Sequence, residues 1–322
     1  MIWAQVVFRV NISMKKHVTN VLFLTAAHCL YASNPVFRAA DPYALLIDGT
    51  VYVYPTSGAQ NQFFVFTSSD LVTWKTHPAI LDFNDLPWIP SDKHAWAPAV
   101  IENNGSYYFY YSVGPKPSRI GAAVGTSPLG PFTDSGQSLL SDEGKPGFEA
   151  IDPMVFRDPN TNTCYLYAGG SAGAKLRVFE MNPDMISFAR EVEVQTPQNF
   201  TEGVFMHVRN GTYYLSYSHG SYRHSSYSVH YATSATPTGA WDYQGPILVS
   251  DDTYKGPGHH SFFYNSVNDQ WYIVYHRWEN VSGDGPYSGS RKTAIETIEY
   301  EPDGRIKPVT MTAKGVGPTK FQ

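Results

Sequence analysis

The chain has 322 residues, enough for a large core, and a formal net charge of −5 at pH 7. It contains no run rich in lysine and arginine, which argues against a phosphate-tracking surface and therefore against nucleic acid as a partner. Aromatic residues make up 15% of the chain, and its 26 glycines and 23 prolines are scattered, so the composition favours many short strands joined by tight turns.

Residues 1–32 have the pattern of a secretory leader. Two lysines follow Met14, an apolar run covers residues 21–27, and the small residue Ala32 comes near the end. The run is too short to span a bilayer. We predict that residues 1–13 are an upstream extension, that cleavage follows Ala32, and that the mature protein is secreted or periplasmic and free of the membrane. An ordinary buried strand or helix is the alternative.

The chain has only two cysteines, Cys29 and Cys164. Removal of the leader would leave Cys164 alone, so no intrachain disulfide is expected. Stability must then come from the size of the core.

An internal repeat organises the rest of the chain. Each copy is an apolar strand, a tight turn and a second strand that is mostly rich in tyrosine, and successive copies start 50 to 57 residues apart. Three copies place Asp-Gly or Asn-Gly at the turn, the strongest short-range signal for a β-hairpin. The copies begin at Asp41, Ala97, Asp152, Glu202 and His259.

A second half-repeat, a turn that delivers an aromatic residue, follows most copies, as in residues 69–74 and 127–132. The spacing is about that of a four-stranded propeller blade. We therefore predict an all-β, five-bladed β-propeller that forms a single domain over residues 33–322, with residues 291–310 completing the last blade. A β-sandwich is the structural competitor, but a repeat above 50 residues suits it poorly.

The first residues of the repeats carry the candidate chemistry. The innermost strand of a blade begins near the central axis. We therefore expect Asp41, Asp152 and Glu202 to lie close together at one end of this axis, with Trp96 and His259 beside them. An aspartate before proline can also be a simple turn cap. Three acids at equivalent positions of the repeat favour a functional site.

Several of these motifs resemble glycoside hydrolase family 43. The resemblance extends from residue 41 to residue 309 and rests on ordered short motifs at blade spacing. They are Asp41-Pro42, Trp96-Ala97-Pro98, Ile151-Asp152-Pro153, Thr201-Glu202-Gly203, and Gly258-His259-His260-Ser261 followed by Tyr275-His276. The resemblance implies a five-bladed propeller and an inverting glycoside hydrolase that acts on plant-wall hemicellulose or pectin side chains.

The resemblance also implies roles for the three acids. Inversion needs a carboxylate base that activates water and a carboxylic acid that protonates the leaving oxygen. Asp41 corresponds to the base and Glu202 to the acid. Asp152 corresponds to a third carboxylate that raises the pKa of Glu202 and orients it.

Three further residues match family positions. His259 corresponds to a histidine near the axis that ligates calcium or holds water in many members, and a hydrogen-bonded core histidine is the alternative. Trp96 is a candidate wall for stacking against the sugar, or else a core residue. Arg291 resembles an arginine that reaches the sugar hydroxyls, or else is a surface residue. No cofactor is implied as a requirement, although a structural calcium near the axis is expected from the resemblance.

The expected partner is an oligosaccharide or polysaccharide. The favoured activity is that of an exo-acting β-xylosidase or α-L-arabinofuranosidase. An endo-arabinanase or exo-galactanase remains open, because the loops over residues 83–94 and 144–149 decide between a pocket and a groove. A non-catalytic carbohydrate-binding propeller is the third hypothesis, although a binder would have no need of three acids.

Overall fold

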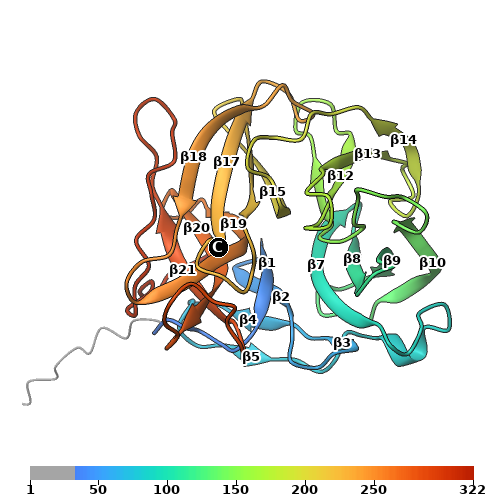
Figure 1. The fold of residues 1–322 in the computed structure, drawn as a ribbon, viewed down its shortest axis with the longest axis horizontal. Helices are drawn as coiled ribbons and strands as arrows, with labels where there is room; N and C mark the ends of the chain where they lie inside the picture. The colour runs from blue at the N-terminus through green and yellow to red at the C-terminus, as the bar shows by residue number, and fades with distance from the viewer. Residues whose placement is uncertain (1–32) are drawn as a thin grey trace, which may run out of the picture.

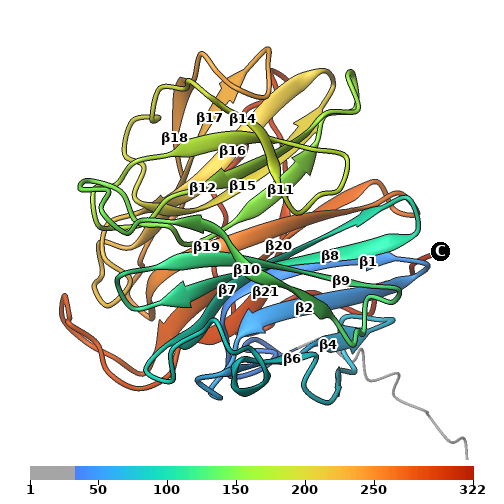
Figure 2. The same cartoon turned by 90° about the vertical axis from the view of Figure 1, so that its right-hand side faces the viewer.

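Five antiparallel sheets surround a central axis in the structure, a computed structural model that describes residues 33–322 (Figure 1). The strands β1, β7, β15 and β19 lie near the centre, and the last strands of the blades lie at the rim. Figure 2 shows the blades from the side, with each sheet twisted. The predicted all-β, five-bladed propeller is confirmed. Among the described residues, no helix has the length and apolar character that a membrane crossing requires.

The first blade has the order β1 (Ala40–Ile47), β2 (Thr50–Thr56), β4 (Phe66–Ser68) and β5 (Lys75–Thr76). The second contains β7 (His94–Asn103), β8 (Ser106–Gly114), β9 (Arg119–Gly125) and β10 (Thr133–Ser141). The third contains β11 (Met154–Arg157), β12 (Cys164–Ala168), β13 (Arg177–Met181) and β14 (Phe188–Val192). The fourth contains β15 (Glu202–Arg209), β16 (Thr212–His219), β17 (Ser228–Ser234) and β18 (Asp242–Leu248).

The fifth sheet has three strands, β19 (Tyr254–Asn265), β20 (Gln270–Glu279) and β21 (Lys292–Ile298). A small sheet of β3 (Gln62–Phe63) and β6 (Leu81–Asp82) extends the first blade, and the short 3₁₀ helix η1 (Phe83–Asp85) follows β6. The predicted hairpin turns are present, since both residues of Asp48-Gly49, Asn104-Gly105 and Asn210-Gly211 have positive φ. This is the geometry that a type I′ turn requires.

Tyrosines tie each blade to the next one. Tyr54, Tyr110 and Tyr167 stand at matching positions of β2, β8 and β12, and all three are fully buried. Their hydroxyl groups donate to the carbonyl oxygens of Pro128, Met185 and Pro237, which lie in the outer turns of the following blades. A buried phenol needs such a partner. These bonds explain why tyrosine and the second half-repeat occur together in the sequence.

The prediction that residues 291–310 complete the last blade is only partly right. β21 joins the sheet, and the Asp303-Gly304 turn forms and accepts a hydrogen bond from the Tyr214 hydroxyl. The N-terminal segment, however, pairs with the outer edge of β21: the Val36 amide donates to Thr293 O, and the Thr293 amide to Phe37 O. Such pairing covers an edge that would otherwise be exposed and joins the two ends of the ring.

Candidate active site

The inner end of every blade has the same unusual backbone. One residue in each has a positive φ between 34° and 63°, and in four blades the register of the first strand pair shifts there. Only one of the five is a glycine, although non-glycine residues seldom adopt this conformation. Such turns concentrate at functional sites, where they redirect side chains. The five residues are Asp41, Ala97, Asp152, Gly203 and His259.

Hydrogen bonds to the second strand of the preceding blade hold four of these five turns. The amide groups of Ala97, Asp152 and His259 donate to hydroxyls on the second strand of the preceding blade, at 2.7 to 2.8 Å. The Asp41 amide donates to His276 Nδ1 at 3.2 Å. The hydroxyl acceptors are Thr56, Ser112 and Ser218, in the blade order one, two and four.

The junction between blades three and four is the exception. The register of β11 and β12 places Gly169 where the other blades have a hydroxyl or imidazole. A β-carbon there would lie 2.1 Å from Lys175 O, so no side chain fits. The amide of Gly203 donates instead to Asp152 Oδ2, at 3.1 Å. Asp152 therefore holds the turn that carries Glu202 through the backbone.

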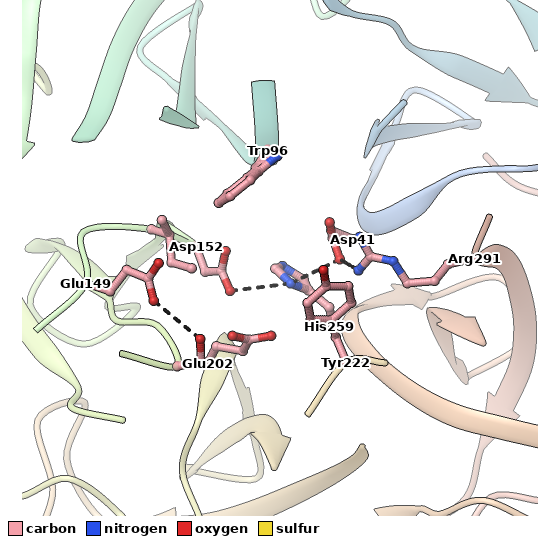
Figure 3. Close-up of a pocket in the computed structure, with 10 residues that line it drawn as sticks. Asp41, Trp96, Glu149, Asp152, Glu202, Tyr222, His259 and Arg291 are labelled. Carbon is pink, nitrogen blue, oxygen red and sulfur yellow. Dashed lines mark hydrogen bonds and ion pairs between the residues drawn. The ribbon is translucent and has the colours of Figure 1, made fainter. Parts of the chain in front are cut away.

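These turns surround a cavity of about 220 Å³ at the axis (Figure 3). All six residues predicted for the site line it, so the structure brings them together; their individual roles remain predictions. The full lining consists of Asp41, Trp96, Glu149, Ile151, Asp152, Ser171, Glu202, Tyr222, His259 and Arg291.

Asp41 is buried beside a cation. Its Oδ1 lies 2.6 Å from Arg291 Nη1 and 3.4 Å from His259 Nδ1. Burial alone would raise the pKa of Asp41, but the charge of Arg291, together with His259, holds it well below its usual value. Asp41 is therefore an ionised carboxylate over the whole physiological range, as a general base must be.

The pKa of Glu202 is shifted in the opposite direction to that of Asp41. Glu202 is buried in the same pocket, and its Oε1 accepts a hydrogen bond of 2.8 Å from the Tyr227 hydroxyl. Burial raises the pKa of Glu202 to about 7, and the charges of Asp41 and Glu149 add to this rise while Tyr227 and Arg291 oppose it. Glu202 thus retains a large protonated fraction near neutral pH, which a general acid needs.

Asp152 also has a raised pKa. Burial is the largest cause, and the nearby carboxylates of Glu202, Asp41 and Glu149 add to it. Figure 3 shows His259 between Asp152 and Asp41; its Nδ1 lies 3.5 Å from Asp152 Oδ2. Burial lowers the pKa of His259, and the charge of Asp41 opposes this effect.

The described residues around His259 show no calcium site. Within residues 33–322, no three His, Cys, Asp or Glu side chains are grouped so that they could hold a metal ion. The Asp41 oxygen nearest His259 is also the one paired with the Arg291 guanidinium, whose charge would repel a divalent cation. The structural calcium expected from the resemblance therefore stays a prediction.

Trp96 and Arg291 frame the pocket from different blades. A β-carbon at Gly114 would lie 2.1 Å from the Trp96 ring, so the indole lies directly against the backbone of β8. The Arg291 guanidinium lies 5.0 Å from the centre of the Tyr222 ring. Both residues face the cavity, which disfavours the alternatives of a core tryptophan and a simple surface arginine.

The sequence indicated no site role for Glu149, Tyr222 and Tyr227, and it marked His276 only as part of the Tyr275-His276 motif. A detectable signal existed for His276, because it occupies the repeat position of Thr56, Ser112 and Ser218. The other three lie in or beside loops between strands, outside the repeated part of the blades. Nothing in the repeat pattern marks them.

Comparisons with known proteins agree with this geometry. The profile of glycosyl hydrolases family 43 matches residues 32–306. The chain is 35% identical to Beta-D-galactofuranosidase xynD of Aspergillus niger, over 96% of this chain and 94% of that protein. It is 30% identical to Arabinoxylan arabinofuranohydrolase of Bacillus subtilis, over 91% of this chain and 67% of that protein.

A solved structure shares the same architecture. The crystal structure of a thermostable family-43 glycoside hydrolase superposes with a TM-score of 0.76 at 28% identity, and the match covers 89% of this chain and 99% of that one. The family profile, the relatives and the propeller with its carboxylate-lined pocket lead to one conclusion: the chain belongs to glycosyl hydrolases family 43 and is an inverting glycoside hydrolase.

Proposed function

We propose that the chain removes single terminal sugars from hemicellulose side chains, with Glu202 as the general acid and Asp41 as the general base. One observation carries these roles: two buried carboxyl groups line one pocket, and their environments move their pKa values in opposite directions. Such a pair is what an acid and a base working at the same pH require. A non-catalytic binder has no use for this separation.

In the proposed reaction, Asp41 takes a proton from a water molecule as its oxygen attacks the anomeric carbon. The bond between that carbon and the glycosidic oxygen breaks, and Glu202 gives its proton to the leaving oxygen. Asp41 ends protonated and Glu202 ionised, and proton exchange with solvent restores both. Arg291 keeps Asp41 ionised, and Asp152 holds the turn of Glu202 through the Gly203 amide.

The shape of the pocket supports exo action. Its volume of about 220 Å³ is small, and Trp96, Glu149 and Tyr222 stand around it on different blades. Relatives carry names of β-xylosidases, arabinosidases, arabinofuranohydrolases and a galactofuranosidase. A terminal xylosyl or arabinofuranosyl unit is therefore the proposed substrate group, and a galactofuranosyl unit, which shares the five-membered ring with arabinofuranose, belongs in the same test.

The predicted leader belongs to this proposal as well. Residues 1–32 lie outside the described residues, and Asn34, just after the predicted cleavage site, is buried in the propeller. Export would thus leave the ring-closing segment intact. N-terminal sequencing of secreted material should find Ser33 first; an intact Met1 or Met14 would refute the leader.

The test of the acid compares leaving groups in the variant Glu202→Gln. We expect natural glycosides to lose about 10²- to 10⁴-fold in kcat, because their leaving oxygen needs a proton. Aryl glycosides with a good leaving group should lose far less. Equal losses on both would contradict the acid role of Glu202. The same aryl-glycoside panel, run with the unaltered enzyme on xylosides, arabinofuranosides and galactofuranosides, identifies the sugar.

A further inference from the structure

A tyrosine hydroxyl reaches Glu202 from the segment before β17. The Tyr227 hydroxyl donates to Glu202 Oε1 at 2.8 Å. A phenol has one hydrogen to donate, and this bond uses it. The nearby Ser218 Oγ accepts from the His259 amide at 2.8 Å, and the Ser218 side chain opposes the rise that burial causes in the pKa of Tyr227.

Packing of the Tyr227 ring fixes its hydroxyl oxygen beside Glu202. The side chain is fully buried, and its ring stacks on His276 with 5.7 Å between centroids and 9° between planes. On another side, a β-carbon at Gly258 would lie 2.1 Å from the ring, so the absence of a side chain there makes room for it. The Tyr227 amide also donates to His224 O, at 3.1 Å.

The direction of the hydrogen bond from Tyr227 decides which oxygen of Glu202 carries the acid's proton. An oxygen that accepts a hydrogen bond from a fixed donor is a poor place for the acid's own proton, because two hydrogens would then face each other. The proton of Glu202 is thereby directed to its other oxygen, Oε2. We propose that Tyr227 is a positioning residue that places the proton of Glu202 on Oε2. The proposal rests on the proposed role of Glu202 as the acid.

Several charged groups act on Glu202 together with Tyr227. Asp41 and Glu149 raise its pKa and Arg291 lowers it, and Glu202 in turn raises the pKa of the buried Asp152. The hydrogen bond from Tyr227 stabilises the ionised form and so lowers the pKa of Glu202. Removing only the hydroxyl should leave the other groups in place and raise the pKa further.

The experiment uses Tyr227→Phe, which removes one oxygen and keeps the ring. Glu202 must be protonated to act, so activity falls as pH rises through its pKa. We expect the alkaline limb of the kcat profile to move up by about 1 pH unit, since the lost bond is one to a charged group. At the optimum, kcat on a natural glycoside should fall about tenfold with KM nearly unchanged. The kcat on an activated aryl glycoside should fall much less.

Tyr167→Phe is the matched control, because it removes another buried hydroxyl, bonded to Pro237 O and remote from the pocket. It should leave the pH profile unchanged. A merely structural role for Tyr227 would lower the melting temperature without moving the alkaline limb, and this result would overturn the proposal.

The double variant Tyr227→Phe with Glu202→Gln separates the two proposals. If Tyr227 acts through Glu202, adding Tyr227→Phe to Glu202→Gln should cause little further loss. Full additivity would overturn the role of Tyr227 and leave the acid assignment standing. If Glu202→Gln itself shows no dependence on the leaving group, the acid role fails first.

Discussion

At the scale of single residues, the site depends on one cation among four carboxylates. Asp41, Glu149, Asp152 and Glu202 all line the pocket, and Arg291 is bonded to Asp41 alone among them. The pairing separates the ionised carboxylate of Asp41 from Asp152 and Glu202, whose pKa values are raised. In the proposed mechanism, the position of Arg291 therefore decides which carboxylate serves as the base.

Replacing Arg291 by glutamine tests this directly. Without the guanidinium, burial would dominate and the pKa of Asp41 should rise. Because the base must be ionised, the acidic limb of the kcat/KM profile should move to higher pH, by about 1 unit or more. Arg305→Gln, which breaks an exposed pair with Asp303, is the control and should change nothing. An unmoved acidic limb in Arg291→Gln would refute this account of Asp41.

Prediction of single site residues from the sequence worked for those at equivalent positions of the five repeats. Asp41, Asp152 and His259 occupy the left-handed position itself, and Trp96 and Glu202 the position before it, so a count along the repeats finds them. Arg291 was found through the family resemblance. Tyr227 was missed because its contact depends on how the segment between β16 and β17 packs against Gly258 and His276. That packing is a property of the assembled ring.

At the scale of elements, the inner turns form a nearly regular ring of bonds between blades. Thr56, Ser112, Ser218 and His276 each accept one amide hydrogen bond from the next blade. The third blade departs from the rule at Gly169, and Asp152 replaces the missing acceptor. The sequence displays the strands and hairpins, but it hides this substitution, because a carboxylate at Asp152 looks purely catalytic.

Two variants at Asp152 separate the effect of its hydrogen bond to the Gly203 amide from the effect of its charge. Asp152→Ala leaves the buried Gly203 amide without an acceptor and should lower the free energy of unfolding by about 1–3 kcal/mol. Asp152→Asn keeps a carbonyl oxygen at the same place and should lose clearly less. Denaturant unfolding of both measures the difference. Equal losses would show that the bond to Gly203 contributes nothing to the fold.

At the scale of the whole molecule, both ends of the described chain help to close the ring. Asn34 donates from its side chain to Ile295 O and Glu296 Oε1, next to the pairing of residues 36–37 with Thr293. The C-terminal residues cross several blades, with Val309 bonded to Ile247 in blade four and Thr319 to Asp70 in blade one. The repeat predicted five blades, whereas these closing contacts fall outside the repeat and needed the structure.

The ring also fixes where the proposed acid and base stand. Asp41 begins the first blade and Glu202 the fourth, so the two belong to blades that are not neighbours. In the proposed mechanism, a water molecule stands between the base and the sugar. Inverting pairs are typically about 6.5–9.5 Å apart, against ~5 Å for a pair that forms a covalent intermediate.

The anomeric configuration of the first product tests this account most directly. Proton NMR during early hydrolysis reads the anomer before mutarotation mixes the two forms. We predict a product of configuration opposite to that of the substrate, because Asp41 acts through water and not as a nucleophile. A product that retains the configuration of the substrate would contradict the role of Asp41 as a base, and with it the central claim.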